Sequence, residues 1–121
     1  MPRTIVSTSD AAAPPPFYSQ AVICAGLVFV SGTAPHDPTT GRITGVTVQE
    51  QTAQCLRNIA AILAAAGSSL DKAVSATVIL AEEGDLATSM KNGSNGFRSI
   101  RPRGRARGCR SRFPGCWCRS R

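Results

Sequence analysis

Cysteine is the residue type in this chain with the widest chemistry, because a thiolate binds metals and attacks electrophiles. Three of the five cysteines, Cys109, Cys116 and Cys118, lie at C-x6-C-x-C spacing. Zinc sites instead pair their ligands at C-x2-C to C-x4-C spacing and need a fourth ligand. His36, the only histidine, is distant in the sequence. We therefore expect no metal site here, and exposed thiols that are liable to oxidation.

The single histidine is a poor basis for acid–base catalysis. His36 lies in the stretch TAPHDPTTGRITG (residues 33–45), whose Pro, Asp and Gly content is typical of a loop. A catalytic base also needs a partner that orients it. We expect His36 to be exposed to solvent and to take no catalytic part.

Arginine dominates the end of the chain. Residues 99–121 hold eight arginines and no acid, and residues 89–121 as a whole carry a net charge of +10. Such a segment attracts nucleic acid through its phosphates, in a salt-sensitive way and without regard to sequence. Phe97, Phe113 and Trp117 could stack on bases. The other interpretation is a disordered chain, since Arg-Gly runs without a scaffold bury little.

The first 88 residues have a different composition. They hold four cations against seven acids, a net charge of −3, and are rich in alanine and valine. A length of 121 residues allows one domain. We predict a folded domain over residues 1–88 and a basic tail without fixed structure over residues 89–121.

Two observations bear on the compartment. No apolar run approaches the roughly 20 residues that a membrane span needs, and no charged segment followed by an apolar one marks a secretory signal. Five cysteines is an odd number for a disulfide framework. We expect a cytoplasmic protein; a mitochondrial transit segment in MPRTIVSTSDAAAPPP (residues 1–16) is the alternative, opposed by Asp10 and the prolines. Cys24 and Cys55 are expected to be small buried hydrophobes.

The elements that would position any site begin with strands. Residues 4–8 have strand composition, and residues 21–24 and 27–32 flank a turn at Ala25-Gly26, which predicts a hairpin. A further short strand is expected at residues 42–44. The uncharged, β-rich run at residues 73–80 predicts a central strand.

One helix is clearly marked. Thr47 and Glu50 fit the capping box that begins a helix, and Gly67 stands where a left-handed C-terminal cap is expected. An apolar stripe is predicted on one helix face, at Leu56, Ile59, Ala60 and Leu63. The result is an α+β fold, a sheet with a helix packed on one face. After Asp85 the hydrophobic periodicity stops, where a second helix is expected.

Three stretches resemble one family: YSQAV (18–22), LVFVSGTAP (27–35) and QTAQCLRNIAAILAAAGSSLDKAVSATVIL (51–80). They are similar to the RidA/YjgF proteins, which are reactive-intermediate imine deaminases with the older family name L-PSP endoribonuclease. The resemblance covers about residues 4–88. It implies a chorismate-mutase-like α+β domain and a homotrimer with a ligand cleft at each subunit interface.

The resemblance also implies a reaction: hydrolysis of a 2-imino or 2-enamino acid to a 2-oxo acid and ammonia, with no cofactor. By the same resemblance, Tyr18 is a catalytic cleft residue, and Ser31, Gly32 and Thr33 bind substrate; Thr33 stands where many relatives have glutamine. Two structural interpretations stay open. Tyr18 could be a strand-edge aromatic, and Ser31-Gly32 a strand exit that needs an unusual backbone angle.

The end of the chain departs from the family pattern. The Pro-Ala-Arg motif, whose arginine binds the substrate carboxylate, is absent, and so is the late glutamate of the last strand. Codons re-cut to begin at the last base of each tail codon permit Pro-Pro-Ala-Arg across residues 100–104. The hypothesis is a one-base frame error near residues 88–90. We expect impaired deaminase activity, weak or no trimer formation and poor solubility, with RNA binding or ribonuclease-like action through the tail as the alternative function.

Overall fold

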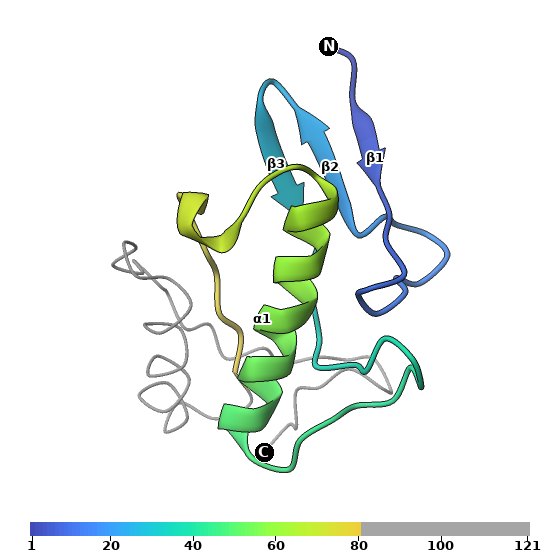
Figure 1. Ribbon diagram of the computed structural model, residues 1–121, viewed down its shortest axis with the longest axis vertical. Coiled ribbons are helices and arrows are strands. Elements are labelled where there is room, and N and C mark those ends of the chain that lie inside the picture. The colour runs from blue at the N-terminus through green and yellow to red at the C-terminus, as the bar shows by residue number, and fades with distance from the viewer. Residues whose placement is uncertain (81–121) are drawn as a thin grey trace.

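The computed structural model describes residues 1–80. These residues form a three-stranded antiparallel sheet, one α-helix and one 3-10 turn (Figure 1). The sheet has the order β1-β2-β3. In chain order the elements are β1 (Thr4–Val6), β2 (Ala21–Cys24), β3 (Leu27–Val30), α1 (Val48–Ala65) and η1 (Leu70–Lys72).

The hairpin forms as predicted, with its first strand at the expected residues and its second strand ending at Val30 rather than at residue 32. Cys24 pairs with Leu27 and Ala21 with Val30, and the two-residue turn between the strands has φ of 51° at Ala25 and 75° at Gly26. Two positive φ values are those of the type I′ turn, whose twist matches that of paired strands. β1 pairs with β2 over three residues, from Thr4 opposite Ile23 to Val6 opposite Ala21.

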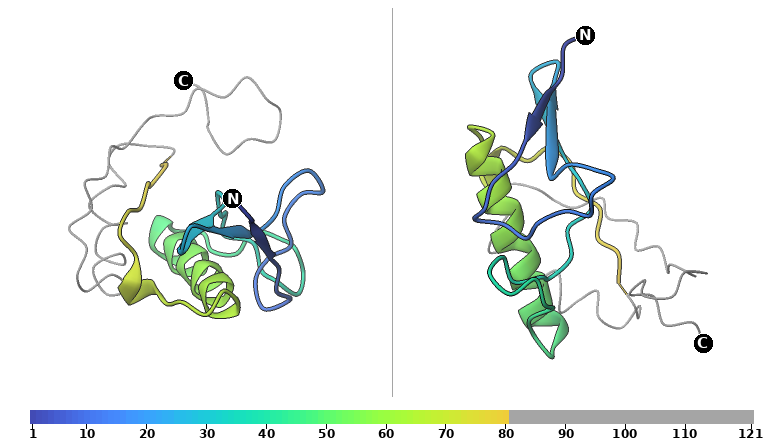
Figure 2. Two further views of the ribbon diagram at one scale, coloured as in Figure 1. Left: turned by 90° about the horizontal axis from the view of Figure 1, so that it is seen from above. Right: turned by 90° about the vertical axis from the view of Figure 1, so that its right-hand side faces the viewer.

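Residues 1–80 cover one face of the sheet. α1 lies along that face (Figures 1 and 2), where Ile62 is buried against Val6, Ala11 and Ala21. Because side chains alternate across a strand, the row Ile5, Val22 and Phe29 faces the other way. Ile5 is 63% exposed and Phe29 57% exposed. The predicted α+β architecture, with a helix on one face of the sheet, is confirmed.

The ends of α1 are also as predicted. The amide of Glu50 donates to Thr47 Oγ1 at 3.2 Å, and the amides of Thr47 and Val46 donate to Glu50 Oε2 at 3.1 and 2.8 Å. These amides lower the pKa of Glu50 below its usual value. At the other end Gly67 has φ of 73°, and its amide donates to the carbonyl of Ala64.

The buried face of α1 differs from the predicted stripe. Gln54, Asn58, Ile62 and Leu63 are buried on the helix, whereas Leu56, Ile59 and Ala60 are only half-buried. Leu63 is therefore the one member of the stripe that is buried. The prediction failed because it counted apolar residues only, while two amide side chains here are buried with hydrogen-bonding partners.

The strand predicted at residues 73–80 is wrong. The segment is not part of any strand in the described structure, and Val74 and Ile79 are 84% and 64% exposed. A β-rich composition makes a strand only where a neighbouring strand pairs with it, and the described sheet ends at β3. The predicted strand at residues 42–44 is reduced to one isolated bridge, between His36 and Ile43.

The remaining predictions about the fold fall on residues 81–121. The boundary at residue 88, the basic tail and the missing second helix all lie outside the described residues. Within residues 1–80, no helix is long and apolar enough to cross a bilayer.

Candidate functional site

Ser31 closes the open end of the hairpin. Its Oγ donates a 2.6 Å hydrogen bond to the carbonyl of Ser19, and its amide donates to the carbonyl of Gln20 at 3.0 Å. The chain entering β2 is thereby joined to the chain leaving β3. Since Tyr18 directly precedes Ser19, the structure brings Tyr18 and Ser31 to the same end of the sheet.

Tyr18 lies partly exposed at that end. Its side chain is 43% exposed, and its ring meets that of Phe17 edge-on, with ring centroids 5.4 Å apart. The amide of Tyr18 donates to the carbonyl of Pro15 at 3.3 Å. The prolines before it restrict the backbone, so the ring stands on a short, constrained loop. Tyr18 precedes β2, which begins at Ala21.

Gly32 and Thr33 continue from Ser31. A side-chain carbon added at Gly32 would meet no atom of the described residues within 4 Å, and Gly32 is not among the glycines with positive φ. The unusual backbone angle considered for Ser31-Gly32 is therefore not observed. Gly32 leaves open space beside the backbone, and Thr33 Oγ1 donates back to the carbonyl of Ser31 at 3.0 Å.

Gln20 is a buried residue at this end of the sheet. The sequence analysis did not identify it. It is 4% exposed; its Oε1 accepts from the amide of Thr8 at 2.7 Å, and its Nε2 donates to the carbonyls of Thr8 and Ala12, each at 3.0 Å. One amide side chain thus holds residues 8–12 against β2. The signal available was a lone glutamine inside an apolar strand-forming motif, which is unfavourable unless hydrogen-bonded.

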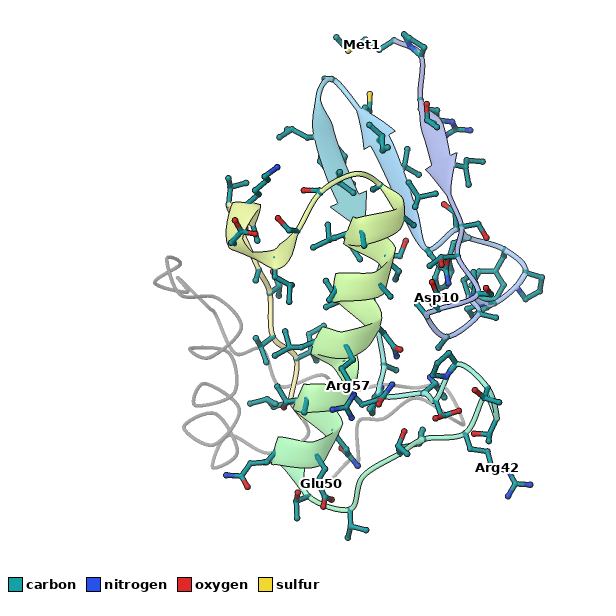
Figure 3. The ribbon with its side chains drawn as sticks, in the orientation of Figure 1. Met1, Asp10, Arg42, Glu50 and Arg57 are labelled. Carbon is teal, nitrogen blue, oxygen red and sulfur yellow. The ribbon has the colours of Figure 1, made fainter. Side chains whose placement is uncertain are left out.

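A second amide network holds the loop after Thr33. Asn58 Nδ2 donates to the carbonyl of His36 at 2.8 Å and to that of Ala34 at 3.3 Å. Gln54 Nε2 donates to the same His36 carbonyl at 3.3 Å, and Arg57 holds Gln54 through its guanidinium. Figure 3 shows Arg57 on the middle of α1, beside this loop. Sequence analysis missed these residues as well.

His36 contributes its backbone to the structure. Its amide and carbonyl are both hydrogen-bonded, whereas no hydrogen bond of its imidazole occurs within residues 1–80. The predicted exposure is wrong, because the residue is half-buried. The adjacent Asp37 accepts from the amides of Thr40 and Thr39, which lower its pKa, and so closes the next turn.

The two cysteines in the described part of the chain are half-buried free thiols. Burial raises the pKa of Cys55 to about 11, which keeps it protonated and unreactive near neutral pH. No group of three or more potential ligands among His, Cys, Asp and Glu occurs in residues 1–80. The three tail cysteines lie outside the described residues.

The amino-acid sequence of this chain is similar to those of known proteins. The sequence model of the family described as Endoribonuclease L-PSP matches residues 8–109, which extends past the predicted limit of resemblance at residue 88. A RutC family protein of Sinorhizobium fredii is 46% identical over 82 residues, 68% of this chain and 65% of its own length. The 2-iminobutanoate/2-iminopropanoate deaminase of Rattus norvegicus is 40% identical over 86 residues, 71% of this chain and 63% of its own. The matched part of the chain thus spans slightly less than two thirds of these relatives.

Solved structures give the same result. A putative endoribonuclease L-PSP from Entamoeba histolytica superposes with a TM-score of 0.85 at 32% identity, over 94% of this chain and 90% of its own. A putative endoribonuclease from Thermotoga maritima gives 0.80 at 35% identity, over 85% and 81%. The predicted resemblance is confirmed: the chain belongs to the Endoribonuclease L-PSP family, the family of the RidA/YjgF proteins.

Proposed function

We propose that this chain is a RidA-type deaminase, which hydrolyses small 2-imino or 2-enamino acids to 2-oxo acids and ammonia, and that its activity is impaired. The similarity to the rat and bovine 2-iminobutanoate/2-iminopropanoate deaminases supports the reaction class. The observation that carries the site is the hydrogen bond from Ser31 to Ser19, which unites Tyr18 with residues 31–33.

In the proposed reaction, water adds to the imine carbon and the nitrogen then leaves as ammonia, so nothing is oxidised or reduced and no cofactor is required. Ser31 and Thr33 already donate their hydroxyl hydrogens to main-chain carbonyls. Each hydroxyl therefore offers a ligand its lone pairs, which suit the imine N–H or the attacking water. The backbone beside Gly32 is open to a planar substrate.

Tyr18 is assigned the proton donor to the departing nitrogen. Its phenol has no hydrogen bond to another described residue, and it lies at the same end of the sheet. A donor placed where charge changes in the transition state lowers the barrier more than one that binds substrate and transition state equally. Residues 31–33 then bind the substrate and Tyr18 acts on it.

The substrate carboxylate lacks its expected partner, and this is the reason for proposing impairment. The sequence has no Pro-Ala-Arg motif. Arg57 is engaged with Gln54 through two hydrogen bonds of 3.1 and 2.8 Å. We propose a homotrimer in the cytoplasm as the assembly for which the domain is suited, weakened by the altered C-terminal segment.

Two chains test the proposal. One is the 121-residue protein; the other, called the frame-shifted product, is made from the gene after the reading frame has been shifted by one base near codons 88–90. Both are given freshly generated 2-iminopropanoate, and 2-oxo acid formation above buffer hydrolysis is followed. The frame-shifted product should turn over substrate and lose most of that rate in Y18F, while the 121-residue chain stays near background.

Each alternative outcome removes one part of the proposal. Robust turnover by the 121-residue chain contradicts impairment. Failure of the shifted frame to encode Pro-Ala-Arg contradicts the frame hypothesis. Undiminished turnover in Y18F contradicts the role of Tyr18, and no turnover by an intact trimeric shifted product contradicts the reaction.

A further inference from the structure

Asn58 is the most deeply buried large side chain in the described structure, at 1% exposure. It lies on the face of α1 that packs toward the sheet, one turn before Ile62. An amide buried there is stabilising only if its polar atoms find partners. They do: Nδ2 donates to the carbonyls of Ala34 and His36, and Oδ1 accepts from Gln54 Nε2 at 3.2 Å.

Gln54 extends the same contact by one helical turn. Its Nε2 also donates to the carbonyl of His36, so this oxygen accepts from two amides, at 2.8 Å from Asn58 and 3.3 Å from Gln54. The guanidinium of Arg57 holds Gln54 Oε1 in place. Two fixed donors on one carbonyl define the position of that peptide more narrowly than one donor would.

The held carbonyls lie next to the candidate site. Ala34 follows Thr33 directly, and the other end of the segment is fixed by Ser31, which bonds to Ser19. Gly32 and Thr33 therefore lie between two anchors, one on the chain that enters β2 and one on α1. The amides of Asp37 and Thr44 continue the anchored loop, donating to Arg42 and Pro35 at 2.8 and 2.9 Å.

We propose that Asn58, supported by Gln54, is a positioning residue for the deaminase site: it fixes the course of residues 32–36 and so the direction of the groups offered by Gly32 and Thr33. Asn58 gives its amide hydrogens to the carbonyls of Ala34 and His36, and Gln54 gives its own to the carbonyl of His36 and to Asn58 Oδ1. Apolar residues at these two helix positions would bury more apolar surface but would leave the loop unheld. The proposal rests on the proposed function.

Hydrogen exchange on the full chain tests the anchoring step. Asn58→Asp keeps the size and the acceptor of the side chain but replaces the amide donor by an oxygen facing the His36 carbonyl. We expect exchange at Asp37 and Thr44 to accelerate by at least about tenfold relative to the amides of β2 and β3, since local opening becomes easier than global unfolding. Ile62→Val, one turn along the same face, is the control and should accelerate all of these amides alike.

Gln54→Met is a second variant, which tests the anchoring step if Asn58→Asp does not fold. It removes one of the two donors to His36 while Asn58 remains, so a smaller acceleration at the same two amides is expected. Uniform acceleration by Asn58→Asp, or unchanged exchange at Asp37 and Thr44 in both variants, would overturn the proposal.

Turnover separates this inference from the proposed function. In the frame-shifted product, Asn58→Asp should lower kcat by about tenfold or more with little change in KM, because a misdirected acceptor orients the attacking water less well in the transition state. Ile62→Val should leave kcat within about twofold. If the parent has no turnover, the proposed deaminase function fails; if the parent is active and Asn58→Asp is equally active, the positioning role fails.

Discussion

The hydroxyl of Ser31 donates to the carbonyl of Ser19 across a distance of 2.6 Å. This bond joins the two chain segments that carry the candidate site, Tyr18 before β2 and residues 31–33 after β3. It also means that Ser31 has a structural task whatever it does to a substrate.

Removing the Ser31 hydroxyl should therefore lower stability. Ser31→Ala leaves the carbonyl of Ser19 without its partner, and we expect the free energy of unfolding to fall by about 1 kcal/mol. Urea denaturation measures it. Ser7→Ala, at an exposed position, should change stability by less than about 0.5 kcal/mol; equal effects of the two changes would contradict the structural role.

Replacing Gln20 should lower stability more than replacing Gln51, a half-buried glutamine of α1. Gln20→Leu leaves the amide of Thr8 and the carbonyls of Thr8 and Ala12 unpaired, so we expect a loss of about 2–3 kcal/mol. Residues 8–12 should also become susceptible to limited proteolysis. Gln51→Leu loses a single bond, to the carbonyl of Gly45, and should cost less than half as much without exposing that loop.

Two substitutions of Thr47 test the N-terminal cap of α1. Thr47→Ala removes the oxygen that accepts from the amide of Glu50 and should cost about 1 kcal/mol, whereas Thr47→Ser should retain most of the stability. Chemical denaturation of the three chains measures this. Identical midpoints for the alanine and serine variants would show that the hydroxyl is not the stabilising group.

Glu50 makes part of the stability depend on pH. Backbone amides of Thr47 and Val46 lower its pKa in the folded state, so its contribution is complete above the pKa of the unfolded chain and is lost as pH falls through the folded value. The stability difference between the parent and Glu50→Gln should therefore shrink steadily as pH falls below about 4.5. A difference that stays constant from pH 7 to pH 3 contradicts this.

Cysteine alkylation should distinguish the thiols. Because burial raises the pKa of Cys55 to about 11, the folded chain at pH 8 should leave Cys55 largely unmodified by iodoacetamide. The tail cysteines, predicted to be exposed, should react first. Mass spectrometry of the peptides measures the extent of alkylation at each cysteine. Labelling in urea is the control, in which all five cysteines react. Rapid labelling of Cys55 in the folded protein would contradict its burial.

The parts of the fold that could be predicted from sequence are local. The turn at Ala25-Gly26 and the capping box of Thr47 and Glu50 depend on residues a few positions apart, so short patterns identify them. The strand at residues 73–80 was wrong because pairing depends on a neighbour elsewhere in the chain.

The supporting residues of the candidate site were missed for a related reason. Asn58 and Gln20 are buried because main-chain carbonyls distant in sequence accept their hydrogens. Polar residues on a predicted core face are read as exposed unless those partners are known. Tyr18 and residues 31–33 were named from resemblance, and their meeting at one end of the hairpin required the register of β2 and β3.

Ala25, in the turn of the hairpin, has a left-handed backbone conformation. Ala25, at φ of 51°, occupies a conformation that costs a residue with a side chain about 1 kcal/mol relative to glycine. The hairpin retains its register because its opposite end is held by Ser31 and Ser19. We therefore expect the two ends to compensate each other: Ala25→Gly should offset part of the stability that Ser31→Ala loses.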